Sequence, residues 1–481
     1  MEQYDSEDWK GLISDYERDV VLAAMLRRDD NRGPTQKNIA RIWKAADLLS
    51  CFQCSKARRH LQSNGLGDPL DEAIIAQMER KHPKRKREIN APTVEELEVT
   101  RKIIDGKLLR EKLKQLKSDV APGLGCLRNE HLSVLLLNPD RPVTPSASAA
   151  VDNLLDYSNA VVQVVLPSYF YAAWVACRLV AANKLSPRDL PPGVTPDARP
   201  VNIGGAERRL ITRAYFDEDL QSNYNEIVKP VQNGVGVPGG ISITTFGVQG
   251  TLDANPHFGC IQGDIKNGYN EVSRASIIDA IWDHPSLYPT LAFVNALLVP
   301  AAYVGMGGGT GLTTAPFRCE KGVHQGAVES GWLFALACNP AFQELNGTLA
   351  QNGGGAMAII DDNYLLGRPE DIFPANVTFA ENLVKVGLQL QPAKSQCYIV
   401  EEHRNTEWEQ ARGNIPNGVL KDADNNPVLE EGQPLHGITT CNIPIGSERF
   451  VKGYLRQKGV KITRGYNDIM ELLDPGRWPH P

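Results

Sequence analysis

Two adjacent carboxylates, Asp361 and Asp362, are the residues whose types and setting most clearly indicate chemistry. They lie between two apolar runs, Ala356–Ile360 and Tyr364–Gly367. A short acidic connection between apolar strands favours a tight reversal, so the pattern predicts a β-hairpin with both acids at its tip. Neighbouring carboxylates repel each other when ionised, and a bound cation removes that repulsion. Such oxygen ligands suit Mg²⁺, although Asp is also common in turns that bind nothing.

A third carboxylate, Asp264, ends another apolar stretch, Phe258–Gly263. The residues that follow at Ala275–Trp282 have the apolar spacing of a helix. A strand ending in Asp264 beside the acidic hairpin would bring three carboxylates to one edge of a sheet. Such a site can hold two divalent cations, which activate a hydroxyl and stabilise a leaving pyrophosphate.

The motifs around these acids resemble those of reverse transcriptases of the LINE type (non-long-terminal-repeat retrotransposons). The resemblance rests on five ordered segments: Asp264–Arg274, Gly322–Phe334, the Asp361-Asp362 hairpin, Gly387–Ser395 and Ile443–Val451. Ala121–Gly125 and Arg199–Val201 extend the likeness upstream, so that it covers roughly residues 40 to 470.

This resemblance implies an α+β protein with the right-hand polymerase fold, in which an RRM-like palm sheet carries the acids. Residues 1–105 would form a helical N-terminal extension, 106–256 the fingers and 257–452 the palm. Residues 453–481 would form only the start of a thumb, beginning with a basic, strand-like stretch.

The resemblance also implies an activity, RNA-directed DNA polymerisation, and a set of site residues. Asp264, Asp361 and Asp362 would bind two Mg²⁺ ions, with Mn²⁺ as a substitute. Lys184 and Arg199 would bind the triphosphate of a deoxynucleotide, and Lys394 would protonate the leaving pyrophosphate. Tyr269 would exclude the 2′-hydroxyl of a ribonucleotide, while Gln325 and Gly326 would open a helix close to the template base. The expected partners are a template RNA and a DNA primer.

Several positions depart from the family pattern. Ala327, Val328 and Glu329 stand where Asp-Pro-Leu is typical, Gly331 replaces a proline, and Ile359-Ile360 replace an aromatic residue and an alanine. These changes leave open a second hypothesis, a captured, non-catalytic nucleic-acid-binding scaffold on the same fold. An RNA-templated RNA polymerase is a third hypothesis, but the chain lacks the residues such enzymes carry near Tyr269 and before the acidic pair.

The overall charge of the chain is unusual for a protein that binds nucleic acid, but it does not exclude a local basic groove. The net charge is −6, yet basic residues cluster at Arg80–Arg87, as nuclear-import signals and phosphate contacts do. A second basic run between Arg101 and Lys117 favours a solvated helix face. The nine scattered cysteines indicate a reduced intracellular compartment, and we expect a nuclear rather than a cytoplasmic protein. The apolar stretch Ala160–Cys177 is interrupted by polar residues and predicts buried core, not a membrane span.

Two glycine-rich segments invite other interpretations. Gly234–Gly239 matches a dinucleotide-binding fingerprint, but no hydrophobic strand precedes it. Gly305–Gly311 lacks the Lys-Ser/Thr of a phosphate-binding loop, so we expect the tip of a hairpin at these residues.

No nuclease pattern precedes the polymerase motifs, and about thirty residues follow Val451. We therefore expect a partner to supply endonuclease or thumb functions.

Overall fold

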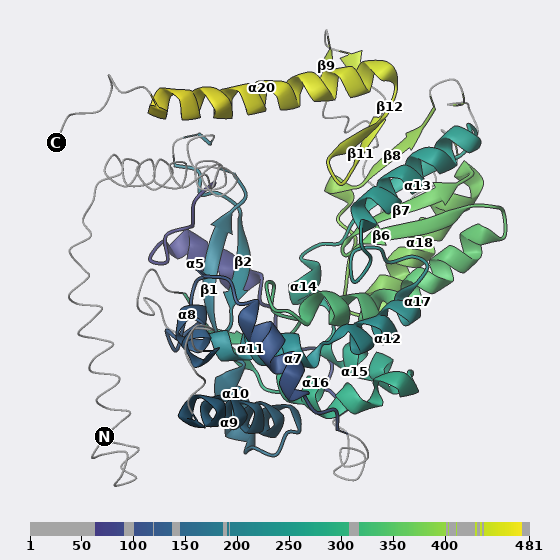
Figure 1. The fold of residues 1–481 in the computed structure, drawn as a ribbon. Helices are drawn as coiled ribbons and strands as arrows, with labels where there is room; N and C mark the ends of the chain where they lie inside the picture. Colours follow the sequence, from purple (N-terminus) through teal and green to yellow (C-terminus); the bar gives the residue numbers. More distant parts are fainter. Residues whose placement is uncertain are drawn as a thin grey trace.

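The computed structural model describes residues 63–90, 101–118, 120–136, 145–185, 190–191, 193–306, 317–400, 403, 410, 429–430, 433–434 and 437–473. Two four-stranded sheets with helices packed around them dominate this part of the chain (Figure 1), which confirms the predicted α+β class. Most of the predicted N-terminal extension lies outside the described residues. Within them, no helix is long and apolar enough to cross a membrane.

The first sheet carries the predicted acids, and we call it the aspartate sheet. Its strands are β3 (Gly259–Asp264), β6 (Gly355–Ile359), β7 (Asp362–Gly367) and β8 (Gln396–Ile399). The spatial order is β6-β7-β3-β8, with every neighbouring pair antiparallel. Helices connect β3 to β6 and β7 to β8, so the order along the chain is that of a split βαβ unit. This topology places the end of β3 beside the start of β7.

Both faces of the aspartate sheet are covered. Helices α17 (Ser330–Ala350) and α18 (Pro369–Lys385) pack on one face, where Ile261 and Leu365 join the main core. The other face packs against α13 (Gly240–Ala254) and the hairpin of β11 (Gly437–Thr440) and β12 (Ile443–Gly446). Cys260 and Tyr364 contribute to this second, smaller core. Alternate strand residues thus point to opposite, buried faces.

The second sheet contains strands from distant parts of the chain, and we call it the basic sheet. It has the order β2-β1-β4-β5, with β1 at Cys177–Asn183, β2 at Ala198–Ile203, β4 at Ala302–Met306 and β5 at Phe317–Cys319. Strand β1 is antiparallel to β2 and parallel to β4. Strands β4 and β5 therefore join the predicted fingers, although their residues lie in the predicted palm range. They form a hairpin, as expected around Gly305, but its tip at 307–316 lies outside the described residues.

The remaining helices connect or support the sheets. Before the aspartate sheet they are α5 (Glu72–Arg80), α7 (Gly106–Lys114), α8 (Asn129–Ser133), η1 (Val134–Leu136), α9 (Pro145–Val162), α10 (Ser168–Trp174), α11 (Ala206–Tyr215) and α12 (Glu218–Val228). Later come α14 (Gly268–Glu271), α15 (Arg274–Trp282), η3 (Pro285–Thr290), α16 (Leu291–Leu298) and η4 (Pro392–Lys394), and the short strands β9 (Leu429–Glu430) and β10 (Gln433–Pro434) form a separate pair. The predicted helix after Asp264 is confirmed as α15, and the side chain of Ser273 caps it by accepting a hydrogen bond from the amide of Ser276.

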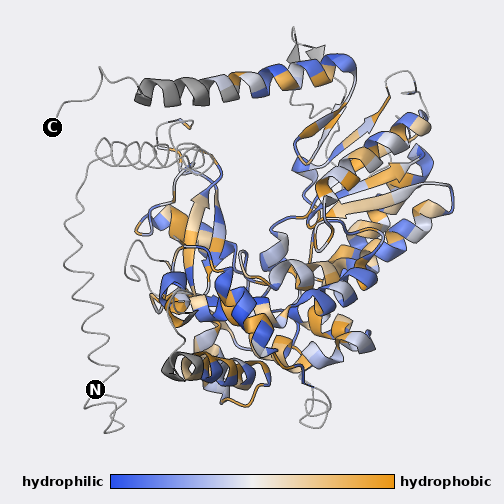
Figure 2. Ribbon diagram, in the orientation of Figure 1, coloured by the Kyte–Doolittle hydropathy of each residue, from blue (hydrophilic) through white to orange (hydrophobic). Residues whose placement is uncertain are grey.

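The last described element corrects the prediction of a strand-like stretch. Residues Glu448–Leu473 form one helix, α20, which leaves β12 and projects away from the aspartate sheet (Figure 1). Phe450 anchors its first turn in a buried position. In Figure 2, hydrophilic and hydrophobic residues alternate along the part of α20 that is coloured by hydropathy, whereas the strands of the aspartate sheet are largely hydrophobic. The spacing of Val451, Tyr454 and Leu455 is helical rather than alternating.

Candidate functional site

The three predicted acids meet at one edge of the aspartate sheet. Strands β6 and β7 form a hairpin whose turn is Ile360-Asp361, and Asp362 begins β7. Asp264, the last residue of β3, pairs in register with Asp362. Ile360 has a φ of +58°, the left-handed value that two-residue hairpin turns require at their first position. The acidic hairpin predicted from the sequence is confirmed.

A segment that runs beside β6 fixes the hairpin tip in place. The side-chain oxygen of Gln232 accepts hydrogen bonds from the amides of Ile360 and Gly234, both at 2.8 Å. The amide of Asn233 donates to the carbonyl of Ala358, also at 2.8 Å. A Cβ atom on Gly234 would lie 2.6 Å from the amide nitrogen of Ile360, so only glycine fits without displacing the turn. This contact, not a dinucleotide loop, explains the glycine at 234.

The electrostatics of the acids indicate a group of carboxylates held close together. Burial, together with the charges of Asp361 and Asp264, raises the pKa of Asp362 to about 6. Burial likewise raises the pKa of Asp361, with the charge of Asp264 as a second cause. Lys394 offsets part of this repulsion, since its Nζ atom lies 3.1 Å from Oδ2 of Asp264. The ammonium of Lys394 thus neutralises part of the negative charge of the three acids.

The donor set fits a divalent metal that completes its shell with substrate. Among the described residues, no group of three or more His, Cys, Asp and Glu side chains is arranged as a ready metal cluster. Mg²⁺, however, is usually bound by one or two carboxylates plus phosphate oxygens and water. Buried carboxylates that raise one another's pKa are stabilised by such an ion, because it removes the repulsion between them. Asp264, Asp361 and Asp362 therefore fit Mg²⁺ or Mn²⁺ together with a phosphate ligand.

A cleft of about 850 Å³ lies in front of these acids, and we call it the carboxylate cleft. The predicted site residues that line it are Lys184, Arg199, Asp264, Tyr269, Gln325, Asp361, Asp362 and Lys394. Asp264 and Asp362 lie in the aspartate sheet and Asp361 in its hairpin turn, whereas Arg199 lies in β2 and Lys184 directly follows β1. Tyr269 lies in α14, and Gln325 and Lys394 lie before α17 and β8. Residues up to about 210 positions apart in the chain thus meet in one space, as the resemblance implies.

Tyr269 lies against the floor of the carboxylate cleft. Its ring stacks on that of Phe334 with a centroid distance of 5.3 Å and an interplanar angle of 27°. Burial, with the charge of Asp361 as a second cause, raises the pKa of the Tyr269 hydroxyl to about 12. The ring is therefore held rigidly, with its hydroxyl protonated at neutral pH, beside the acids.

Gln325 and Gly326 are placed differently from the prediction. They do not open a helix, because α17 begins only at Ser330 and both residues lie in a turn before it. Gly326 has a φ of +108° and does not line the carboxylate cleft. The carbonyl of Gln325 accepts a hydrogen bond of 2.8 Å from the amide of Asn202, which ties this turn to β2.

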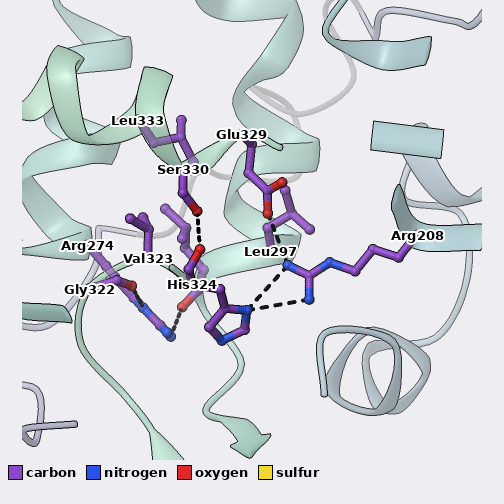
Figure 3. Close-up of a pocket in the computed structure, with 10 residues that line it drawn as sticks. Arg208, Arg274, Leu297, Gly322, Val323, His324, Glu329, Ser330 and Leu333 are labelled. Atoms are coloured by element: carbon purple, nitrogen blue, oxygen red, sulfur yellow. Dashed lines mark hydrogen bonds and ion pairs between the residues drawn. The ribbon is translucent and has the colours of Figure 1, made fainter. Parts of the chain in front are cut away.

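The altered residue Glu329 belongs to a buried polar cluster behind this turn (Figure 3). Its carboxylate accepts a 3.0 Å ion-pair hydrogen bond from Arg208, and the side chains of Arg208 and Glu329 are only 4% and 6% exposed. Arg208 also lies 3.4 Å from Nδ1 of His324, and the hydroxyl of Ser330 donates to the carbonyl of His324. Burial lowers the pKa of His324 well below its usual value, and the charge of Arg208 lowers it further. The cluster joins α11 to the turn that carries Gln325.

Residues of the basic run at Arg80–Arg87 were not predicted as part of the site, but the structure places two of them there. Arg80 and Lys81, at the end of α5, line the carboxylate cleft. Arg85 donates to the carbonyl of Val299 at 2.8 Å, and Arg87 forms an ion pair with Asp279 at 2.6 Å. The run is therefore engaged with the folded protein. Only its charge was visible in the sequence, because the contact depends on how α5 packs.

Comparison with known proteins adds no assignment. Neither the protein-family models nor the curated protein sequences contain a match to this chain.

Proposed function

We propose that this protein is an RNA-directed DNA polymerase that adds deoxynucleotides to a primer 3′-hydroxyl on an RNA template. The observation that carries the proposal is the distribution of charge in the carboxylate cleft. One wall contributes Asp264, Asp361 and Asp362, whereas the basic sheet contributes Lys184 and Arg199. Figure 1 places β1 and β2 on one side of α14, and the β6–β7 hairpin on the other. A triphosphate with bound divalent cations complements both walls.

Each residue has a role that its position supports. Asp264 and Asp361, assisted by Asp362, would hold two Mg²⁺ or Mn²⁺ ions, which when bound supply charge neutralisation and activate the primer hydroxyl. Lys184 and Arg199 would hold the phosphates, and Lys394 Nζ would donate a proton to the leaving pyrophosphate. The right-hand polymerase arrangement, with the aspartate sheet as palm and the basic sheet in the fingers, belongs to this proposal, as do the LINE-type ancestry and the template and primer partners.

Primer extension on an RNA template with Mg²⁺ tests the proposal. We expect extension by the native chain, and a loss of about a hundredfold or more in Asp264→Asn and Asp361→Asn, because catalysis depends on charge stabilisation by these carboxylates. Asp253→Asn is the matched control, since Asp253 lies on the exposed side of α13 and its carboxylate contacts only Gln249 among the described residues. RNA binding should be retained in all three variants.

The experiment also separates the alternatives. RNA binding without extension would favour the non-catalytic scaffold, and extension only with ribonucleotides would favour an RNA-templated RNA polymerase. Near-normal extension by Asp264→Asn would contradict the assignment of the metal ligands.

A further inference from the structure

The end of helix α5 forms part of the carboxylate cleft. In the sequence this helix comes before Lys184, the first of the predicted site residues. Asp71 caps the start of α5 by accepting a hydrogen bond of 2.8 Å from the amide of Ala73, and Ile74 and Met78 are buried. Arg80, the last helical residue, and Lys81, the C-cap, line the cleft. The carbonyl of Lys81 accepts a hydrogen bond of 3.1 Å from the side chain of Asn267, in the loop that follows Asp264.

Helix α5 and the segment before it are held against the β1–β2 hairpin by hydrogen bonds to the backbone of that hairpin. The side chain of Gln77 donates to the carbonyl of Pro196 at 3.2 Å and accepts from the amide of Ala198 at 3.3 Å. The segment before α5 pairs with β1, since Gly67 donates to the carbonyl of Ala181 at 2.8 Å and Gly65 accepts from the amide of Asn183. The position of Lys81 relative to the hairpin is therefore set by the fold, not by a flexible side chain alone.

One carboxylate links the cations of the two segments. Asp197 forms ion pairs with Lys81 of the α5 end and with Lys184 of the hairpin, the latter at 2.5 Å. Burial opposes ionisation of Asp197, but hydrogen bonds from Lys184 and Lys81 lower its pKa below the usual value. Because Asp197 is 55% exposed, this carboxylate contacts solvent and can be displaced by a stronger anion.

The positive charge of this wall exceeds what Asp197 can balance. Arg80, Lys81, Lys184 and Arg199 all line the carboxylate cleft, and Asp197 forms ion pairs with the two lysines but with neither arginine. In the part of the chain that the structure describes, the side chains of Arg80 and Arg199 form no hydrogen bond or ion pair. A wall with such an excess of positive charge attracts anions such as phosphate, although Asp264, Asp361 and Asp362 also line the same cleft. Guanidinium and ammonium groups are the usual protein ligands of phosphate.

We infer that Arg80 and Lys81 form a second phosphate-binding element of the carboxylate cleft, which binds the triphosphate of the incoming nucleotide jointly with Lys184 and Arg199. The identity of the ligand as a nucleotide rests on the proposed function, whereas phosphate binding itself does not. In the free protein Asp197 holds the two lysines in position. A bound triphosphate takes over the hydrogen bonds of Lys81 and Lys184, because it carries more charge than a single carboxylate.

Two variants and a matched control test this inference in the full chain. Lys81→Gln and Arg80→Gln remove one cation each, and Lys229→Gln removes an exposed lysine that pairs with Glu226 outside the carboxylate cleft. Calorimetric titration with inorganic tripolyphosphate measures phosphate binding without any need for catalysis. We expect about tenfold weaker binding in each cleft variant and no change in Lys229→Gln, because a hydrogen bond to a charged group contributes that much.

Kinetics identify which phosphate is bound. In primer extension, we expect Lys81→Gln to raise the KM for deoxynucleotides about tenfold at nearly constant kcat, with an unchanged Kd for template–primer. A weaker Kd for template–primer with an unchanged KM would assign the cations to a nucleic-acid backbone and overturn the triphosphate assignment. If the native chain extends no primer but binds tripolyphosphate through Lys81, the proposed function fails and the phosphate site stands.

Asp197→Asn distinguishes phosphate binding from a structural role of Lys81. If Lys81 only ties α5 to the hairpin through Asp197, Asp197→Asn will weaken tripolyphosphate binding as Lys81→Gln does, and the inference is overturned. If Lys81 binds phosphate, Asp197→Asn will bind tripolyphosphate as tightly as the native chain or more tightly, because the competing carboxylate is gone. Thermal unfolding of each variant confirms that the folded state is compared. Unchanged affinity in folded Lys81→Gln and Arg80→Gln would also overturn the inference.

Discussion

The buried ion pair of Arg208 and Glu329 allows a quantitative prediction. Replacing Glu329 by Leu removes the carboxylate but leaves the Arg208 guanidinium in a site where it is 4% exposed. The neighbouring His324 cannot compensate, because burial and the charge of Arg208 keep its imidazole neutral through a pKa far below the usual value. Loss of one partner of a buried pair costs about 3–5 kcal/mol. We therefore expect Glu329→Leu to lower the free energy of unfolding by about that amount.

Thermal and urea unfolding measure this loss. The entropy of unfolding is roughly 2.1 cal/mol/K per residue, which gives about 1 kcal/mol/K for 481 residues, so Tm should fall by about 3–5 °C. The exposed pair of Glu226 and Lys229 is the control, with side chains 69% and 52% exposed. Glu226→Leu should change the free energy of unfolding by less than about 1 kcal/mol.

A double-mutant cycle tests the electrostatic explanation. Arg208→Met combined with Glu329→Leu removes both charges, so the double variant should be more stable than the sum of the single losses predicts, by about 2–3 kcal/mol. Arg208 also donates to the carbonyl of Val175 at 2.9 Å, and loss of that bond keeps the double variant below the native chain. Two outcomes would refute the reasoning: a loss under about 1 kcal/mol in Glu329→Leu, or single losses that simply add.

Three further predictions concern the carboxylate cleft. Tyr269→Ala should raise ribonucleotide incorporation relative to deoxyribonucleotide in single-nucleotide extension, because removal of the ring makes room for a 2′-hydroxyl, and Tyr288→Ala, at an exposed tyrosine, should not. In EDTA, the free energy of unfolding should decrease as pH rises from about 4 to about 6, because the folded state raises the pKa of Asp362 and loses the stabilising effect of its protonated carboxyl on ionisation. Asp362→Asn should flatten this part of the pH profile. An unchanged slope in that variant would contradict the raised pKa. Gly234→Ala should displace the acidic hairpin, cost about 1–3 kcal/mol and reduce extension, whereas Gly250→Ala, with open space around its Cβ, should be neutral or stabilising.

The sequence predicts the acidic hairpin well because its determinants are local. Two apolar runs separated by a short acidic link can close only as a reversal, and the structure places that reversal at Ile360-Asp361. Strand β3 and helix α15 follow from short-range periodicity in the same way. The gathering of Lys184, Arg199 and Lys394 around the acids came from the resemblance, because no local pattern connects residues that lie in different elements.

Long-range contacts account for the predictions that were wrong or missing. The turn at Gln325 and Gly326 was expected to begin a helix, but Gly326 has a φ of +108°, and the Gln325 carbonyl is hydrogen-bonded to Asn202, 123 residues earlier, so that α17 begins only at Ser330. The basic stretch after β12 was expected to be a strand, but it forms helix α20, which Phe450 anchors by its buried side chain in the first turn. Likewise, β4 and β5 join β1 across the predicted boundary between fingers and palm, a pairing that no local pattern specifies.

The departure of Glu329 from the family pattern bears on whether the cleft is a working site. An ionised glutamate buried without a partner would be costly, so its presence requires a compensating charge at the same position. Arg208 supplies that charge from α11, and the resulting cluster lies directly behind the turn whose Gln325 carbonyl binds the amide of Asn202 in β2. The altered segment is thus tied to α11, and the turn before it to β2, on the side where Lys184 and Arg199 line the cleft. The proposed enzyme would use the acids, the cations and this turn together, whereas the alternative, a non-catalytic scaffold, would need neither the repelling carboxylates nor their alignment with the basic wall.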